Sequence, residues 1–353
     1  MNRASAMVIN EVHPAPDVEL ALEYRDEAHG YHAFVVIHST ARGPAVGGIR
    51  RTRYPNRAAA LEDALALARN MSYKSAAADL PFGGGKSVIW DTGATTRTTL
   101  YRLHAEVIQE LGGRYIGGED LGTTPRDIDG MRSITRFVAG ETDPAPWTAR
   151  GVLRGIQAAA LHRWKSDDLL GCMVALHGCG AVGTCLAQEL HNAGASLLVA
   201  DTDRERARYV VRRFRAFAVD PSELLRLRAD VLAPCAFGGL LDADTIPRLQ
   251  VAIVAGAANN QLRRPDGAEA LARRGILYVP DYLINVGGLM TGGVHLLGWP
   301  LGELSRRVDG IREAVLQILA EAAGRSLTPL AVANRVVTER LCEPRPGAPR
   351  LVQ

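Results

Sequence analysis

The amino-acid sequence predicts an α/β protein of two domains, and three observations carry this prediction. The chain has 353 residues, more than one compact core of ordinary size usually holds. Its hydrophobic content of 47% and charged content of 22% are typical of a soluble globular protein. In its second half, short apolar segments alternate with helical ones, which indicates a parallel sheet covered by helices on both faces.

Residues 1–145 are predicted to form the first domain, in which strands are followed by alternating helices and strands. Strands are expected where β-branched and aromatic residues are frequent, and helices where Ala and Leu are frequent. Pro81 and Gly83–Gly85 are expected to interrupt the pattern before a new strand begins. The expected elements are a strand over 31–39, a helix over 57–78, strands at 87–90 and 114–120, and a helix that starts near Thr124 with Pro125 at its first position.

Residues 146–325 are predicted to form the second domain, and residues 326–353 a C-terminal segment that returns to the first. A proline-containing connection at 145–148 is expected to lead into a helix over 151–164. The expected strands carry the sequences CMVALHG, SLLVAD, VLAPCA, VAIVAGA and ILYVPDY, with the helix AVGTCLAQELHNAG after the first of them. The two domains are expected to enclose a cleft.

A glycine-rich turn opens the helix after the first strand of this second domain. Gly178, Gly180 and Gly183 form the pattern G-x-G-x-x-G, with Ala181 and Val182 in the first turn of the helix. Glycines at these positions let the backbone approach a pyrophosphate, whose charge meets the positive end of the helix dipole. The motif in this context predicts a Rossmann-type dinucleotide-binding domain.

Asp201 closes the next strand, at the distance from the glycines that the dinucleotide fingerprint requires. Its carboxylate can accept hydrogen bonds from the adenosine ribose and should repel a 2′-phosphate. NAD is therefore the expected cofactor, although Arg204 and Arg206 lie close in sequence and keep NADP open. Two later strand ends, at Cys235–Ala236 and Ala257–Asn259, fall where ligands bind in such sheets.

The expected cofactor positions at these strand ends are Cys235, Ala236, Ala257 and Asn259, and Thr148 is added from the connection that precedes the helix at 151–164. Asn259 is expected to hold the nicotinamide ribose or carboxamide, with an ordinary turn asparagine as the alternative.

The net charge of +3 gives no reason to expect nucleic acid or a membrane surface as a partner. No apolar run approaches the roughly 18–20 residues that cross a bilayer. Asn10, Glu11 and His13 interrupt any signal-peptide core, so a cytoplasmic location is expected.

Five cysteines occur, an odd number, and none forms a Cys-x-x-Cys pair. This pattern predicts buried free thiols in a reducing compartment, and no metal ligand set is expected.

Lysine is rare in this sequence. Of 41 basic residues other than histidine, only Lys74, Lys86 and Lys165 are lysine. Two of them lie within one short stretch, 71–90. A buried lysine can lose its proton near neutral pH whereas arginine cannot, so the stretch hints at amine chemistry.

Seven ordered motifs resemble the amino-acid dehydrogenase family that includes leucine, valine, phenylalanine and glutamate dehydrogenases. The resemblance covers about residues 20 to 340. The motifs are GPAVGGIR (43–50), MSYKSAAADLPFGGGKSVI (71–89), GGEDLGTTPRDIDGM (117–131), TARGVLRGIQAA (148–159), APCAFGGLL (233–241), VAGAANNQL (254–262) and GILYVPDYLINVGG (275–288).

The resemblance implies roles for the residues of the first three motifs. Lys74 would pair with the substrate α-carboxylate, helped by the backbone at Gly47 and Gly48. Lys86 would activate the attacking water or stabilise the carbinolamine, for which burial and a second ammonium nearby should lower its pKa towards neutral. Asp120 would handle the α-amino group and its protons. Asn285, from the last motif, would contact the substrate carboxylate.

The implied reaction is oxidative deamination of an L-amino acid. Hydride would leave the α-carbon for the nicotinamide, and water assisted by Lys86 would convert the iminium ion through a carbinolamine to 2-oxo acid and ammonia. The family also implies a homo-oligomer. The alternative outside the enzymes is a non-catalytic regulator that binds a dinucleotide. Such a regulator would not need the two lysines and the aspartate.

Four further positions match residues that line the side-chain pocket in the family: Val46, Gly118, Leu289 and Gly292. Val46 stands where the glutamate enzymes carry a lysine, which disfavours a charged side chain in the substrate. Gly118 and Gly292 should enlarge the pocket and Leu289 should narrow it. Leucine or another branched-chain substrate is expected, with phenylalanine or tryptophan as the rival, because one methylene changes discrimination by only about 1–3 kcal/mol. Val286, where the family usually has alanine, is a departure beside Asn285.

Overall fold

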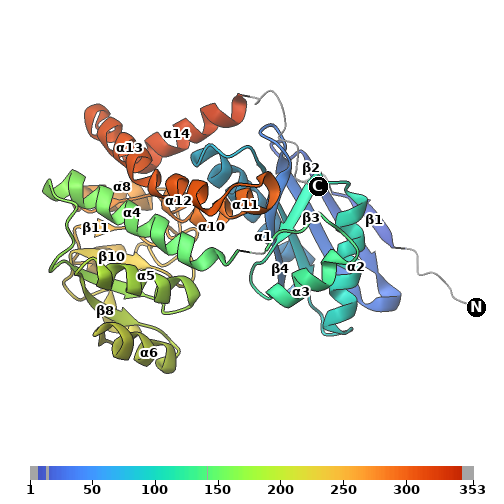
Figure 1. Ribbon diagram of the computed structural model, residues 1–353, viewed down its shortest axis with the longest axis horizontal. Helices are drawn as coiled ribbons and strands as arrows, with labels where there is room; N and C mark the ends of the chain where they lie inside the picture. Colours follow the sequence, from blue (N-terminus) through green and yellow to red (C-terminus); the bar gives the residue numbers. More distant parts are fainter. Residues whose placement is uncertain (1–6, 13–15, 141, 344–353) are drawn as a thin grey trace, which may run out of the picture. The chain divides into compact units, whose positions relative to one another are not determined.

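The computed structural model describes residues 7–12, 16–140 and 142–343, and it forms two compact units (Figure 1). Unit 1 consists of Met1–Thr142, His295–Gly298 and Val337–Gln353, and unit 2 of Asp143–Val294 and Trp299–Val336. Within the described residues each unit is built around a six-stranded sheet. Residues 344–353 of the segment predicted to return to the first domain lie outside the described residues.

Unit 1 contains a mixed sheet with the strand order β1-β2-β3-β5-β4-β6. The first three strands and β5 pair antiparallel, whereas β4 pairs parallel with both β5 and β6. The strands are β1 (Val8–Glu11), β2 (Leu20–Asp26), β3 (Tyr31–Ser39), β4 (Ala45–Thr52), β5 (Gly83–Trp90) and β6 (Tyr115–Gly118). The helices are the short 3₁₀ helix η1 (Glu27–His29), α1 (Arg57–Ala77), α2 (Arg97–Glu110) and α3 (Pro125–Arg132).

Helices cover both faces of this sheet because the side chains of its central strands are apolar in both directions. On β3, Ala33, Val35 and Ile37 belong to the core under α2 and α3, and Phe34 and Val36 belong to the core under α1. This two-sided alternation is what a strand buried on both faces requires.

The triple glycine lies inside β5, which corrects the expectation that Gly83–Gly85 would interrupt regular structure. A Cβ at Gly84 would lie 2.0 Å from the backbone nitrogen of Ser72 on α1, and a Cβ at Gly83 would lie 2.1 Å from the carbonyl oxygen of Ser39. The glycines are therefore explained by close backbone approach and not by a turn.

Unit 2 contains a sheet in which every described pair of strands is parallel, with the order β12-β11-β10-β7-β8-β9. The chain leaves β7 for β8 on one side and later returns to β10 on the other, so the order reverses between β7 and β10. The strands are β7 (Met173–His177), β8 (Ser196–Ala200), β9 (Phe217–Ala218), β10 (Val231–Pro234), β11 (Ile253–Val254) and β12 (Leu277–Tyr278).

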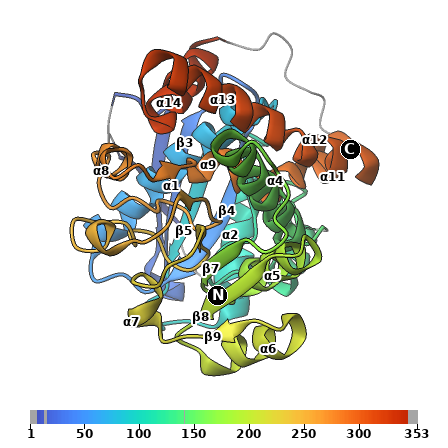
Figure 2. The same cartoon turned by 90° about the vertical axis from the view of Figure 1, so that its left-hand side faces the viewer.

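The helices of unit 2 lie on both sides of its sheet. Figure 2 shows α7 and α8 on one side of β7 and β8, and α4 and α5 on the other. The helices are α4 (Pro144–Trp164), α5 (Ala181–Asn192), α6 (Arg204–Phe214), α7 (Pro221–Leu224), η2 (Ile246–Arg248), α8 (Gly267–Arg273), α9 (Asp281–Ile284), α10 (Gly287–Met290), α11 (Gly292–Leu297, shared with unit 1), α12 (Leu301–Asp309), α13 (Ile311–Arg325) and α14 (Pro329–Cys342, also shared). This arrangement confirms the predicted α/β fold with a Rossmann-type sheet.

The helix α4 begins at Pro144, seven residues before the position expected from the sequence. The segment 145–148 is therefore helical and not a connection. Asp143 caps the helix through a 2.9 Å hydrogen bond from the backbone N–H of Ala145. Pro144 and Pro146 are tolerated because N–H groups in the first turn have no partner within the helix.

The cysteines are free thiols, but their burial differs from the expectation. Cys179 is buried, Cys342 is exposed, and the other three are half-buried. No group of three or more His, Cys, Asp or Glu side chains in the described part of the chain could hold a metal ion. The same residues include no helix that is long and apolar enough to span a membrane.

Candidate active site

The strand register of unit 1 brings three of the sequence motifs together. β4 lies between β5 and β6, with Val46 opposite Gly84 on one side and Ile116 on the other. Gly48 is opposite Gly118 on β6, and the chain reaches Asp120 two residues later. Parallel pairing of central strands therefore sets residues from the motifs at 43–50, 71–89 and 117–131 side by side.

Lys86 and Asp120 form an ion pair beside Gly48. The Nζ of Lys86 is 2.8 Å from Oδ2 of Asp120, and the Lys86 side chain is only 5% exposed. A Cβ on Gly48 would lie 2.7 Å from Cβ of Asp120 and 3.0 Å from Nζ of Lys86. Only glycine leaves the pair undisturbed at this position.

The surroundings change the proton affinity of both partners. Burial lowers the pKa of the Lys86 ammonium, and the charge of Asp120 only partly opposes that effect. Burial alone would raise the pKa of Asp120, but the charges of Lys86 and Arg50 outweigh it and hold that pKa well below its usual range. The leading cationic contribution at Lys86 comes from Arg50, and not from the second ammonium that the sequence suggested.

Arg50 is a member of the site that the sequence prediction missed. Its Nε donates to Oδ2 of Asp120 at 2.9 Å, and its Nη1 donates to Asp63 on α1 at 3.0 Å. The hydroxyl of Tyr54 also donates to Asp63, at 2.5 Å. Arg50 closes the motif GPAVGGIR and lies two residues after Gly48, on the same face of β4, which is the signal that could have identified it.

A buried hydrogen-bond network supports the backbone at Gly47 and Gly48. The hydroxyl of Tyr115 donates to the carbonyl oxygen of Gly47 at 2.9 Å and contacts Oγ of Ser87 at 3.2 Å. His104 bridges Oγ of Ser87 and the hydroxyl of Tyr31, each at 2.8 Å. Burial lowers the pKa of His104 to about 3.

The remaining predicted residues of unit 1 lie on the same elements. Lys74 is half-buried near the end of α1, the helix that packs on β5. Val46 is 7% exposed, so its apolar side chain is almost withdrawn from water. Gly118 has more room than Gly48, since a Cβ there would meet its nearest atom, the carbonyl oxygen of Ala139, at 3.5 Å.

In unit 2 the predicted glycines surround the start of α5, at the carboxyl end of β7. Gly178 has φ 105°, and a Cβ there would lie 2.8 Å from the backbone nitrogen of Ala236, the residue after Cys235. A Cβ on Gly183 would lie 2.0 Å from the carbonyl oxygen of Gly178. These two glycines are explained by packing of the turn between β7 and β10, where the strand order reverses.

Gly180 differs, because no atom of the described residues beyond its two chain neighbours lies within 4 Å of the Cβ it could carry. It is the N-cap of α5, and no side chain caps the helix, so the first N–H groups, which include those of Ala181 and Val182, have no partner within the helix. Asp201 accepts a 2.6 Å hydrogen bond from the N–H of Cys179 and lies next to this helix end. These residues fit a dinucleotide, since open backbone donors and a neighbouring carboxylate match a pyrophosphate and a ribose.

Asn285 and Asn259 meet beyond the end of β11. The Nδ2 of Asn285 donates to Oδ1 of Asn259 and to the carbonyl oxygen of Ala257, each at 3.0 Å. The Oδ1 of Asn285 is buried and has no hydrogen-bond partner among the described residues. Both donor hydrogens are thus used, so Asn285 would have to release one of them to contact a carboxylate.

Three further predicted positions lie on helices of unit 2. Thr148 on α4 donates to the carbonyl oxygen of Pro144 at 2.9 Å, and a Cβ on Gly288 of α10 would lie 2.6 Å from its Oγ1. Leu289 on α10 and Gly292 at the start of α11 are half-buried.

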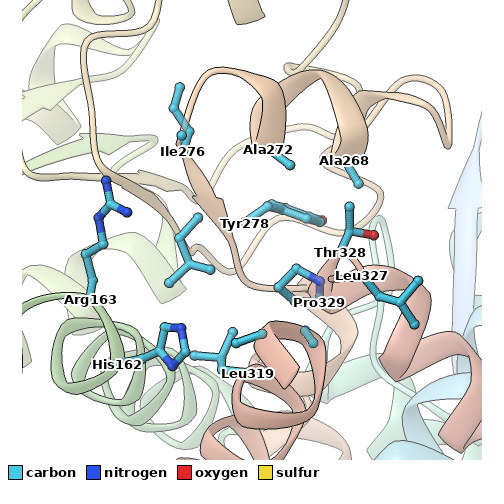
Figure 3. A pocket seen from close by; sticks show the side chains of 14 residues that line it. His162, Arg163, Ala268, Ala272, Ile276, Tyr278, Leu319, Leu327, Thr328 and Pro329 are labelled. Atoms are coloured by element: carbon cyan, nitrogen blue, oxygen red, sulfur yellow. The ribbon is translucent and has the colours of Figure 1, made fainter. Parts of the chain in front are cut away.

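A cavity of about 220 Å³ in unit 2 is separate from all these residues (Figure 3). It lies between the end of α4, α8, β12 and the α13–α14 connection, and mostly apolar side chains such as Leu319 and Leu327 line it. None of the predicted site residues is part of its wall.

The sequence matches family descriptions in both of its halves. Residues 16–136 match "Glu/Leu/Phe/Val dehydrogenase, dimerisation domain", and residues 199–341 match "Glutamate/Leucine/Phenylalanine/Valine dehydrogenase". A leucine dehydrogenase of Thermoactinomyces intermedius is 39% identical over 92% of this chain and 91% of its own length. An L-tryptophan dehydrogenase of Nostoc punctiforme is 41% identical over 88% of this chain and 89% of its own.

A solved structure gives the same result. The crystal structure of L-tryptophan dehydrogenase from Nostoc punctiforme superposes with a TM-score of 0.80 at 40% identity, covering 92% of this chain and 96% of the other. With both halves matched and relatives aligned over nearly the full length, the chain belongs to the glutamate, leucine, phenylalanine and valine dehydrogenase family and is an oxidoreductase of the amino-acid dehydrogenase type.

Proposed function

We propose that the chain catalyses the reversible, NAD-dependent oxidative deamination of a hydrophobic L-amino acid to its 2-oxo acid and ammonia. Leucine or another branched-chain amino acid is the favoured substrate. The observation that carries the proposal is the ion pair between Lys86 and Asp120, 2.8 Å apart and beside the glycine backbone of β4. A buried lysine of lowered pKa next to a carboxylate is suited to proton transfer near the working pH.

Lys86 acts in this proposal as the base that takes a proton from the attacking water. When it loses its proton, the 2.8 Å contact keeps Nζ directed at Asp120. Lys74 pairs with the α-carboxylate, and the backbone at Gly47 and Gly48 supports the same group.

Asp120 is arranged to receive the substrate ammonium. Lys86 and Arg50 both contact its Oδ2, and no donor among the described residues is bound to its Oδ1. The side chain is 24% exposed, so Oδ1 is accessible to a ligand. A carboxylate that stays charged, because its pKa is held low, can accept hydrogen bonds from an α-ammonium.

The cofactor contributes the hydride acceptor, and the chain contributes its binding site. The open N-terminus of α5 at Gly180 supports pyrophosphate binding, and the Asp201 carboxylate supports NAD over NADP. Cys235, Ala236, Ala257, Asn259 and Thr148 complete the proposed cofactor site.

The side chain of the substrate is proposed from the few pocket residues. Val46 is buried and apolar, which disfavours glutamate because its carboxylate would lose water without gaining a partner. Leu289 favours an aliphatic side chain. The alternative is an aromatic substrate, favoured by the space at Gly118 and by the relative named L-tryptophan dehydrogenase.

The first experiment measures reduction of NAD and NADP at alkaline pH with a panel of aliphatic, aromatic and acidic L-amino acids. Leucine, valine or isoleucine should give the highest kcat/KM, with NAD preferred. Highest activity with phenylalanine or tryptophan would replace the aliphatic assignment by the aromatic one. No activity with any amino acid would refute the proposed reaction.

Lysine variants test the site itself. Lys86→Ala should lower kcat by more than about a hundredfold while NAD binding remains, because the base is lost. Lys165→Ala is the matched control, since Lys165 is exposed at the end of α4. If Lys86→Ala kept wild-type turnover, the assignment of Lys86 as the base would be refuted.

We also propose that the protein is a homo-oligomer, on the basis of the match of residues 16–136 to a dimerisation domain. Light scattering coupled to gel filtration measures this directly, and a monomeric mass at micromolar concentration would contradict it.

A further inference from the structure

We infer that Arg50 is a positioning residue for the reaction, which fixes the carboxylate of Asp120 and, together with Asp63, sets the charge around the Lys86–Asp120 pair. The inference rests on the proposed function, in which Lys86 and Asp120 handle protons. It adds two residues, Arg50 and Asp63, to which the sequence motifs assigned no role in the chemistry.

Arg50 determines which oxygen of Asp120 remains available. Its Nε contacts Oδ2 at 2.9 Å, the same oxygen that Nζ of Lys86 contacts at 2.8 Å. Two cations on one oxygen fix the carboxylate plane from two directions. Oδ1 is then left without a donor among the described residues, as a substrate ammonium requires.

Arg50 is itself held from its other side. Its Nη1 donates to both carboxylate oxygens of Asp63, at 3.2 and 3.0 Å. Tyr54 donates to the same carboxylate at 2.5 Å. The guanidinium is 19% exposed, so it bridges α1 and the loop after β6 in a mostly buried position. A planar guanidinium, whose N–H donors point in fixed directions, suits such a bridge better than the flexible ammonium of lysine does.

Arg50 and Asp63 act on Lys86 with opposite signs. Lys86 and Arg50 contact the same oxygen, so their nitrogen atoms lie close enough for strong repulsion in a buried site. The Arg50 charge lowers the pKa of Lys86, and the Asp63 charge raises it. With Lys86 protonated the four side chains carry no net charge, and with Lys86 neutral they carry one negative charge.

Charged and titratable groups around Lys86 come from β4, β6, the loop after β6, and α1 with the residues before it. Arg50 extends from β4, Asp120 follows β6, and Asp63 extends from α1. Tyr54 precedes α1 and Tyr115 belongs to β6; burial raises the pKa of both phenols, so they stay neutral. Lys74 lies on α1, eleven residues after Asp63.

The low lysine content makes a direct measurement possible. Selective ¹³Cε labelling of lysine gives signals from three residues, and the signal lost in Lys86→Arg identifies Lys86. Titration of the full-length protein should place the midpoint of Lys86 on the order of one pH unit higher in Arg50→Gln than in the wild type. Asp63→Asn should shift it in the opposite direction.

The neighbouring arginine provides a matched control. Arg51→Gln removes the same charge from the next residue of β4, whose side chain lies on the other face and pairs with Asp91. It should leave the Lys86 midpoint unchanged. An equal shift in Arg50→Gln and Arg51→Gln, or shifts of the same sign in Arg50→Gln and Asp63→Asn, would overturn the charge assignment.

Kinetics test the positioning role. Arg50→Lys keeps the positive charge but loses the planar guanidinium that contacts Asp120 and Asp63 at once. The titration midpoint of Lys86 should therefore be retained while kcat falls at least about tenfold. Wild-type kcat in Arg50→Lys would refute positioning. If the wild type lacked deaminase activity, the proposed function would fail, whereas the titrations would still decide the charge assignment independently. Asp63→Asn and Arg50→Lys keep both roles testable if Arg50→Gln does not fold.

Discussion

Replacement of Gly48 by alanine should disturb the site through a single methyl group. That methyl would lie 2.7 Å from Cβ of Asp120 and 2.8 Å from the carbonyl oxygen of Glu119. The first separation is about 0.8 Å below the optimum for two carbon atoms, ~3.5 Å. The loop after β6 must move, since one of the two atoms belongs to the backbone. Overpacking of this size costs about 1–3 kcal/mol, and a displacement near 1 Å lowers turnover about a hundredfold.

Urea unfolding and initial rates of amino-acid oxidation measure the two effects. Gly118→Ala is the control for stability, because it lies opposite Gly48 in the register and its methyl would meet Ala139 at an ordinary 3.5 Å. Gly130→Ala on α3 is the control for activity, since no described residue outside its own helix lies within 4 Å of its added Cβ. Equal unfolding midpoints in Gly48→Ala and Gly118→Ala, or equal kcat in Gly48→Ala and Gly130→Ala, would refute the reasoning.

Three other predictions concern charge and pH. Asp201→Asn should lower the preference for NAD over NADP at least about tenfold, because repulsion of a 2′-phosphate is lost; an unchanged ratio of kcat/KM values would contradict this. Burial alone would raise the pKa of Glu23, but its hydrogen bonds to Arg57, Arg25 and His32 hold it at about 2. The Glu23 carboxylate should contribute up to about 3 kcal/mol to the free energy of unfolding above pH 4.5, and this contribution should be lost as the pH falls towards 2. The unfolding free energies of wild type and Glu23→Gln should therefore converge over that range. Burial lowers the pKa of His104 to about 3, so on acidification the unfolded chain binds this proton at a higher pH than the folded protein does. The free energy of unfolding should therefore fall between pH 6.5 and pH 3. In the same urea assay, the fall should be less steep in His104→Gln.

The sequence predicted the periodic parts of the fold well. The strand at 31–39, the long helix from Arg57 and the helix starting at Pro125 were found because their apolar patterns and caps are local signals. The starts of β5 and α4 were misplaced for one reason. Glycine and proline were interpreted as breaks, although tertiary contacts with α1 make glycine necessary in β5, and the first turn of a helix accepts proline.

The motifs predicted Lys74, Lys86 and Asp120 as the chemical residues of unit 1, and the structure sets Lys86 and Asp120 in contact. Arg50 belongs to the motif GPAVGGIR but received no role, because its role depends on a contact with Asp63 on α1, a residue with no sequence signal of its own. The hydrogen bonds of the Asn285 amide could not be predicted from the sequence either, since they depend on which carbonyl oxygen lies beside it in the fold.

The glycine contacts between α1, β4 and β5 have an evolutionary consequence. A Cβ on Gly47 would lie 1.8 Å from the carbonyl oxygen of Gly85, and one on Gly84 would lie 2.0 Å from the backbone of α1. The spacing of the elements that carry Lys74 and Lys86 is thus fixed by main chain against main chain. Side chains that surround a substrate can therefore be substituted during evolution without moving the two lysines. New substrate specificities can then arise while the catalytic chemistry stays the same.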